Sequence, residues 1–217
     1  MNEKCQFMRS RNEQEKAQRR ETLLNAAQEV FFKQGFEKTS MDDIASSAGF
    51  SRALLYVYFK DKKDIYQAIK IRAIKALHNR MIEAVSLCNT GVEQAMATGL
   101  AYYDFYLQDT HYFNCLSLNI SLNNQCKKME RSEEGIEIEK AIMQIMIDAL
   151  KRGIQDNTLD ANKINNPLET ALFMRGSLHG VILMQDNDGQ HLLNKAGINT
   201  DSMIRNGIKH LVQSLAS

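Results

Sequence analysis

Proline is nearly absent from this sequence, and glycine is sparse. The 217 residues include one proline, Pro167, and 11 glycines. Because an all-β chain needs frequent turns, and turns use these residues, their scarcity favours long helices. No stretch alternates apolar and polar residues over the length of a strand, which also argues against a sheet. We therefore expect an all-α protein.

Cysteine pairs at the spacing of metal sites or redox motifs are missing as well. The four cysteines are Cys5, Cys88, Cys115 and Cys126, and no two of them form a CxxC pair. This wide spacing excludes a disulfide framework and the usual zinc spacings, and it suits a reducing cytosol.

Long apolar runs are absent too. No run approaches the roughly 18 residues that a membrane helix needs. No apolar stretch follows the N-terminal Lys4, Arg9 and Arg11, so a signal peptide is not expected either. We expect no membrane association and a cytoplasmic location.

No catalytic constellation is visible. The five histidines are scattered, at His78, His111, His179, His191 and His210. None belongs to an HExxH motif, and there is no GxSxG sequence or phosphate-binding glycine loop. We therefore expect no catalytic residues, no metal ligands, no cofactor and no enzyme activity. A helical enzyme that uses a central cavity would need paired acid and base groups that the sequence does not display.

The net charge of +1 conceals an asymmetry between the two parts of the chain. Residues 1–85 hold 16 Lys and Arg against 11 Asp and Glu, a balance of +5, and residues 86–217 have a balance of −4. A basic first third suggests a module that faces an anion. Chance variation explains the same asymmetry, so charge alone leaves both interpretations open.

Hydrophobic periodicity predicts about nine helices. Their expected ranges are 14–34, 41–48, 52–58, 62–85, 91–108, 111–122, 126–153, 168–185 and 201–215. Gly35 lies where the first of these helices would end. Two loops are expected, at 156–167 and 185–200, because the first is rich in Asn and Asp and the second contains glycines.

The stretch from Thr39 to Asp64 predicts two short helices joined by a tight turn. Ser40 and Asp43 have the spacing of a capping box, and Ser51 suits the N-cap of the following helix. Gly49 accepts the backbone angles of a sharp turn between them. This is a helix-turn-helix arrangement. We expect four of its apolar residues to face inward: Ile44, Ala45, Leu54 and Phe59. Asp61 is expected to cap the next helix.

The second of these helices carries side chains that suit contact with nucleic acid. Its hydroxyl groups, the guanidinium of Arg52 and the ammonium groups of Lys62 and Lys63 match phosphate oxygens and base edges. Spacing alone leaves a second interpretation open, in which an ordinary helical hairpin exposes a solvated face.

The same stretch closely resembles the DNA-binding domain of the tetracycline-repressor (TetR) family. The residues that carry the resemblance are Gly35-Phe36, Thr39-Ser40, Ile44-Ala45, Ala48-Gly49, Ser51, Tyr56-Val57-Tyr58-Phe59 and Lys62, within about residues 18–70. Phe50 and Ala53 depart from the pattern, and the change at Ala53 puts one base contact in doubt. The resemblance implies a dimeric transcriptional regulator, most often a repressor that a small ligand releases.

We expect the DNA contacts to come from this motif. The predicted DNA-binding residues are Thr39, Ser40, Ser51, Arg52, Ala53, Tyr56, Tyr58 and Lys62. Ser51, Arg52 and Ala53 should meet the major groove, whereas the tyrosines, Lys62 and Thr39 should hold phosphates.

Aromatic and methionine side chains gather in the middle of the chain. The candidate ligand-pocket residues are Tyr102, Tyr103, Phe105, Tyr106, Phe113, Met129, Met143 and Met146. Aromatic rings bind apolar ligands, and flexible methionines adapt to their shape. The same residues would serve equally as ordinary core, and the sequence leaves both interpretations open.

The last two long helices are candidates for a dimer interface. The expected interface residues are Met174, Ser177, Gly180, Met184, Ile204, Ile208 and Leu211. Two such helices from each chain can form a four-helix interface across a two-fold axis. The alternative is that both helices are internal to one chain.

These features predict two domains. Residues 1–62 would form a three-helix DNA-binding head, with the motif at about 40–59, and residues 63–217 a helical ligand-binding and dimerisation body. We expect a homodimer, a palindromic double-stranded operator and a small, partly apolar effector. An activator of the same family and a helical ligand-binding or adaptor protein without DNA binding remain the alternatives.

Overall fold

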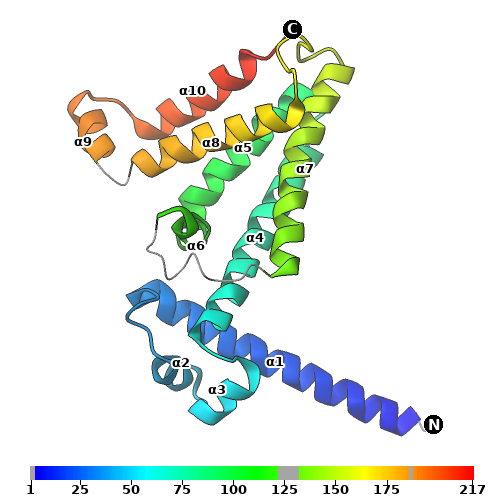
Figure 1. Ribbon diagram of the computed structural model, residues 1–217, viewed down its shortest axis with the longest axis vertical. Coiled ribbons are helices and arrows are strands. Elements are labelled where there is room, and N and C mark those ends of the chain that lie inside the picture. Colours follow the sequence, from blue (N-terminus) through cyan, green and yellow to red (C-terminus); the bar gives the residue numbers. More distant parts are fainter. Residues whose placement is uncertain (1–2, 122–131, 186–187) are drawn as a thin grey trace. The chain divides into compact units, whose positions relative to one another are not determined.

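The structure of the protein is a computed structural model that describes residues 3–121, 132–185 and 188–217. In these ranges it contains ten α-helices, with no strand and one isolated β-bridge between Leu159 and Ala216 (Figure 1). The prediction of an all-α fold is confirmed. The chain divides into two compact units, one comprising Met1–Arg72 and Leu118–Ser132 and the other Ala73–Ser117 and Glu133–Ser217.

The N-terminal unit contains three helices and the start of a fourth. They are α1 (Glu3–Gln34), α2 (Met41–Ala48), α3 (Arg52–Tyr58) and the part of α4 (Lys62–Ser86) up to Arg72. The core of this unit includes the fully buried Leu23, Ile44, Leu55, Ile65 and Ile69, so each helix contributes an apolar face. Beside this core, the rings of Phe31, Phe36 and Tyr66 pack together with centroids 5.0–5.8 Å apart. Such aromatic contacts fix the turn after α1 against α4.

The C-terminal unit contains the rest of α4 and six further helices. They are α5 (Gly91–Gln108), α6 (Thr110–Ser121), α7 (Glu133–Gln155), α8 (Pro167–Met184), α9 (Asp188–Lys195) and α10 (Thr200–Gln213), and α6 belongs to this unit up to Ser117. Helix α5 packs against α7, α8 and α10, and α8 lies beside α10 (Figure 1). None of the helices in the described ranges combines the length and apolar character needed to cross a membrane.

Two glycines let α5 approach α7 closely. A Cβ atom placed on Gly91 would lie 1.9 Å from the backbone nitrogen of Gly153. The carboxylate of Asp156 accepts the N–H of Gly91 at 2.7 Å and the hydroxyl of Thr158 at 2.6 Å. The loop expected at 156–167 is therefore present up to Asn166, and its polar residues hold it against the start of α5.

The structure differs from two expected helix ranges and from one expected loop. Helix α1 begins at Glu3 rather than near residue 14, and α7 begins at Glu133, whereas residues 126–131 lie outside the described ranges. The expected loop at 185–200 contains α9. Gly197 follows that helix with a φ of 67°, and the N–H groups of Gly197 and Ile198 bond back to carbonyls inside it. This glycine therefore terminates a short helix, a role that looks the same in sequence as a glycine in a loop.

Candidate nucleic-acid interface and ligand cavity

Helix α2 begins with a complete capping box. The Ser40 hydroxyl accepts the N–H of Asp43 at 3.1 Å, and the Asp43 carboxylate accepts the N–H of Ser40 at 2.8 Å. Bonds from the hydroxyl and N–H of Ser40 hold the pKa of the Asp43 carboxyl below its usual range. The predicted capping box is confirmed. Ser40, a predicted DNA-binding residue, is exposed, but its hydroxyl donates a hydrogen bond to the Asp43 carboxylate.

A glycine turn connects α2 to α3. Gly49 has φ 69° and ψ 25°, a left-handed conformation that glycine adopts without strain. Ser51 then accepts the N–H of Leu54 at 3.2 Å as the N-cap of α3. Both features agree with the sequence prediction. Asp61 likewise accepts the N–H of Asp64 at 2.9 Å and caps α4, as expected.

The residues that hold α3 in place are Leu55 and Phe59. Both side chains are almost completely buried, as are Ile44 and Ala45 of α2, whereas Leu54 is only half-buried. The prediction of Leu54 as an inward-facing residue was wrong by one position. Leu55 and Phe59 are four residues apart and therefore lie on one face of the helical turn.

The opposite face of α3 is exposed. Ser51, Arg52, Ala53 and Tyr56 all lie on it, as a surface for nucleic acid requires. Val57 is 69% exposed and was missing from the predicted set. Its position two residues after the buried Leu55 turns it away from the core, and this spacing was the signal available in the sequence.

Arg52 forms an ion pair within the motif. Its guanidinium lies 2.8 Å from the carboxylate of Asp42 in α2 and 5.6 Å from the ring centroid of Tyr56. The hydrogen bond to the Tyr56 hydroxyl, together with the charge of Asp42, raises the pKa of Arg52. Both ion-pair partners are exposed, so DNA can exchange with Asp42 for the guanidinium.

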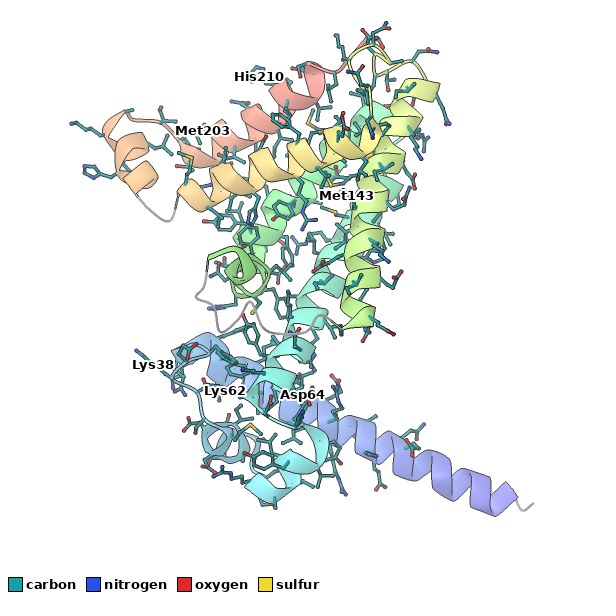
Figure 2. All side chains as sticks on the ribbon, in the orientation of Figure 1. Lys38, Lys62, Asp64, Met143, Met203 and His210 are labelled. Atoms are coloured by element: carbon teal, nitrogen blue, oxygen red, sulfur yellow. The ribbon has the colours of Figure 1, made fainter. Side chains whose placement is uncertain are left out.

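Two side chains that were predicted to contact phosphates form hydrogen bonds to backbone carbonyls of the N-terminal unit. Thr39 is 3% exposed, and its hydroxyl donates to the carbonyl of Gly35 at 2.7 Å. The Lys62 ammonium (labelled in Figure 2) donates to the carbonyls of Phe36 at 2.7 Å and Glu37 at 3.4 Å. Lys62 and Tyr58 are both half-buried.

The C-terminal unit contains a small, mostly apolar cavity. Its volume is about 30 Å³, and it lies among α4, α5, α7, α8 and α10. The lining residues are Met81, Thr98, Gly99, Tyr102, Met146, Met174, Arg175, Leu178, Ile208 and Leu211. Of the eight predicted pocket residues, only Tyr102 and Met146 line this cavity.

The other predicted pocket residues lie elsewhere. Tyr103, Phe105 and Phe113 are buried in the core, with Tyr106 packed against them. Met143, on α7 (Figure 2), packs against a second core cluster, and Met129 lies outside the described residues. These four aromatic residues pack in the core, where rings from α5 and α6 contact one another.

Polar groups meet beside the cavity. The Tyr102 hydroxyl and Nδ1 of His179 share a hydrogen bond of 2.6 Å, and Nε2 of His179 is buried and has no hydrogen-bond partner among the described residues. Burial raises the pKa of Tyr102 to about 12. Burial, reinforced by the charge of Arg175, lowers the pKa of His179, so the imidazole is neutral near pH 7. In the described ranges no group of three or more His, Cys, Asp and Glu side chains has a geometry that would hold a metal ion.

Helix α8 has a broad exposed apolar face. Gly180 and Met184 lie on it, together with Leu172 and Phe173, which are 52% and 69% exposed. Ser177 is half-buried. Leu172 and Phe173 were not among the predicted interface residues, although their spacing of seven or eight from Gly180 puts them on its side of the helix.

Three of the predicted interface residues are internal. Met174, Ile204 and Ile208 are each at most 7% exposed, since they pack into the core of their own unit. Their side chains are therefore unavailable to a partner, and Leu211 is half-buried. This burial corrects the sequence prediction for α10, whose apolar stripe faces inward.

These features define an all-helical protein with an N-terminal helix-turn-helix unit and a C-terminal helical unit that contains a cavity. Residues 23–69 match the family described as bacterial regulatory proteins, tetR family. This match lies within the N-terminal unit and includes the helix-turn-helix motif.

Curated regulatory proteins and solved structures are also similar to this chain. The chain is 31% identical over 102 residues to the HTH-type transcriptional activator FasR of Mycolicibacterium smegmatis, covering 47% of each protein. It is 38% identical over 74 residues to the HTH-type transcriptional repressor BepR of Brucella suis, covering 34% of this chain and 35% of that protein. The chain thus matches less than half the length of these two relatives.

A solved bacterial regulatory protein of the tetR family from Rhodococcus has a similar fold. Its TM-score is 0.65 at 16% identity, with 91% of this chain and 97% of that chain covered. At this identity the likeness concerns the fold alone.

Proposed function

We propose that this protein is a cytoplasmic, homodimeric, DNA-binding transcriptional regulator, a repressor that leaves its operator when a small molecule binds the C-terminal unit. The observation that carries the proposal is the exposed face of α3, where Ser51, Arg52, Ala53, Tyr56 and Val57 are accessible beside a glycine turn. A short helix of this kind fits the major groove of DNA.

The exposed face of α3 offers two kinds of contact with base edges. Arg52 suits the paired acceptors of guanine once it leaves Asp42. Ala53 and Val57 are four residues apart and form an apolar strip, which suits the methyl group of thymine. Ala53, which departs from the family pattern, would therefore contact thymine as part of this apolar strip.

Phosphate contacts come from the margins of this face. Lys60 and Lys63 are exposed, and Ser51, Tyr56 and Tyr58 supply hydroxyl groups. An ammonium group has three donors, so Lys62 keeps one for a phosphate while it holds two backbone carbonyls. The amide groups around Ser40 are the remaining candidates at the start of α2.

The dimer would place two copies of α3 on successive turns of a palindromic operator, roughly 34–36 Å apart. Its interface would use the exposed face of α8 around Gly180, where no described residue lies within 4 Å of an added Cβ atom. Gly180→Leu should therefore give monomers in sedimentation and a loss of operator binding. Gln144→Leu adds the same side chain to an exposed position on α7 and should leave the dimer intact.

Helix α4 would transmit the effect of ligand binding from the cavity to the DNA-binding motif. It begins at Lys62, beside the motif, and continues to Met81, which lines the cavity. A ligand that displaces Met81 would move this helix and change the spacing of the two motifs. A change of a few ångströms would prevent simultaneous docking on one operator.

The experiment is a binding titration with the DNA upstream of the protein's own gene. The wild type should bind a discrete site. Arg52→Ala and Val57→Ser should each relax the sequence preference at different positions and leave the salt dependence unchanged, because base contacts release no counterions.

Lys63→Ala is the matched variant for the phosphate contacts. It should reduce affinity for all sequences and lower the salt slope by about 1. A wild-type protein that binds no DNA would favour the adaptor alternative. A transcription assay separates repression from activation, since one relative in each class is similar to this chain.

A further inference from the structure

The chemical class of the ligand can be inferred from the lining of the cavity, and this inference rests on the proposed function. Nine of the ten lining residues are uncharged, and most of them are apolar, including three methionines, Met81, Met146 and Met174. The single charged residue is Arg175 of α8. Thr98 also lines the cavity, but its hydroxyl donates to the carbonyl of Ala95 at 2.8 Å.

Arg175 differs from Arg80 and Arg205, two other arginines of the C-terminal unit. Arg80 and Arg205 each have a carboxylate within 2.8 Å, those of Asp109 and Asp104 respectively. Among the described residues, no ion pair includes Arg175, although it is half-buried. Its hydrogen-bond partner is the hydroxyl of Tyr102, which is neutral. Charged groups that are withdrawn from water are usually paired with an opposite charge, and none of the described residues supplies one to this guanidinium, so we expect an anion to do so.

The neighbours of Arg175 are suited to an anion but supply no negative charge. The Tyr102 hydroxyl is bonded to His179, and both groups are neutral near pH 7. A guanidinium binds a carboxylate through two parallel hydrogen bonds. A phosphate monoester would bring nearly two negative charges to a site with one cation, whereas a carboxylate brings one.

We propose that the cavity binds an amphipathic monocarboxylate, with its carboxylate on Arg175 and its apolar chain among Met81, Met146 and Met174. The cavity of about 30 Å³ has room for only one or two water molecules as it stands. Binding therefore requires the methionine side chains to move. Methionine has an unbranched and polarizable side chain, which allows this adaptation with little strain. The ligand thus selects an open form of the unit.

The first experiment compares octanoate with 1-octanol on the full-length protein by calorimetry. The two probes share an apolar chain and differ in charge, so octanoate should bind at least about tenfold more tightly. Arg175→Met should reduce octanoate binding to the level of 1-octanol. Lys151→Met removes a positive charge from an exposed position on α7 and should leave octanoate binding unchanged. Arg175→Lys keeps the charge and should retain part of the preference.

The second experiment places the ligand by nuclear magnetic resonance of methionine methyl groups. Octanoate should shift the methyl signals of Met81, Met146 and Met174. Met203, on α10 (Figure 2), lines a separate groove of about 310 Å³ between α8 and α10, and its methyl signal should not shift. Leu178, Ile208 and Leu211 line both spaces, so Met203 is the reporter that distinguishes them.

Equal binding of octanoate and 1-octanol would overturn the proposal. So would an absence of binding by both probes, or shifts at Met203 without shifts at the three cavity methionines. Operator binding is measured separately, without any ligand. A protein that binds octanoate through Arg175 but binds no DNA would refute the proposed function and support the proposed ligand site. A protein that binds DNA but does not bind octanoate would refute the ligand site and support the proposed function.

Discussion

Lys62→Ala should destabilise the N-terminal unit as well as weaken DNA binding. The Lys62 ammonium donates to the carbonyl of Phe36 at 2.7 Å and lies 4.4 Å from the centroid of the Phe36 ring. A hydrogen bond to a charged group contributes about 1.5–3 kcal/mol, and a cation–π contact at a partly exposed site about 0.5–1 kcal/mol. Because Lys62 is half-buried, water screens part of both contributions. We expect a net loss of about 1–3 kcal/mol.

Native-state hydrogen exchange on the full chain is the appropriate assay, because it reports the opening free energy of each helix separately. Amides of α1, α2 and α3 should exchange faster in Lys62→Ala, whereas those of α7 and α8 should not change. Lys63→Ala is the control, since Lys63 is exposed on the same turn of α4. It should affect DNA affinity without affecting exchange. Wild-type exchange rates throughout the N-terminal unit of Lys62→Ala would refute this reasoning and return Lys62 to the class of pure phosphate contacts.

Three further outcomes are expected. Asp42→Asn should tighten operator binding in a fluorescence anisotropy titration, because it frees Arg52 and removes a negative charge beside the DNA; weaker binding would mean that Asp42 positions Arg52 on its base. Hydrogen bonds from Ser40 lower the pKa of Asp43 in the folded state, so their stabilising effect is complete above the usual value of 3.8 and is lost as the pH falls below it. Thermal unfolding of the wild type should therefore lose more stability than Asp43→Asn below about pH 4. Gly91→Ala should strongly destabilise the C-terminal unit, because its Cβ would lie 1.9 Å from a backbone nitrogen of α7, and calorimetry of the full chain would detect this.

The proposed DNA-binding surface was largely predictable because its signals are local. The capping box of Ser40, the N-cap of Ser51 and the left-handed Gly49 each depend on residues within four positions along the chain. Hydrogen bonds over so short a distance form in the same way wherever the helix is placed. The position of the motif and most of its exposed residues therefore followed from the sequence.

The solvent exposure of individual side chains, in contrast, depends on residues that are distant in the sequence. Lys62 is partly covered because the carbonyl of Phe36, 26 residues earlier, lies beside its ammonium. Ile204 and Ile208 form an apolar stripe that a partner subunit and the chain's own core would cover equally well, and packing against the same unit is what the structure shows.

The cavity shows the same limit. Ten lining residues come from five helices, and no spacing within one helix could bring Met81, Tyr102 and Arg175 together. The helices, their caps and the helix-turn-helix motif were predictable from the sequence, since they depend on short-range hydrogen bonds and periodicity. Which apolar faces are covered, and which guanidinium has no carboxylate beside it among the described residues, could not be predicted, because both depend on the packing of helices that are distant in sequence.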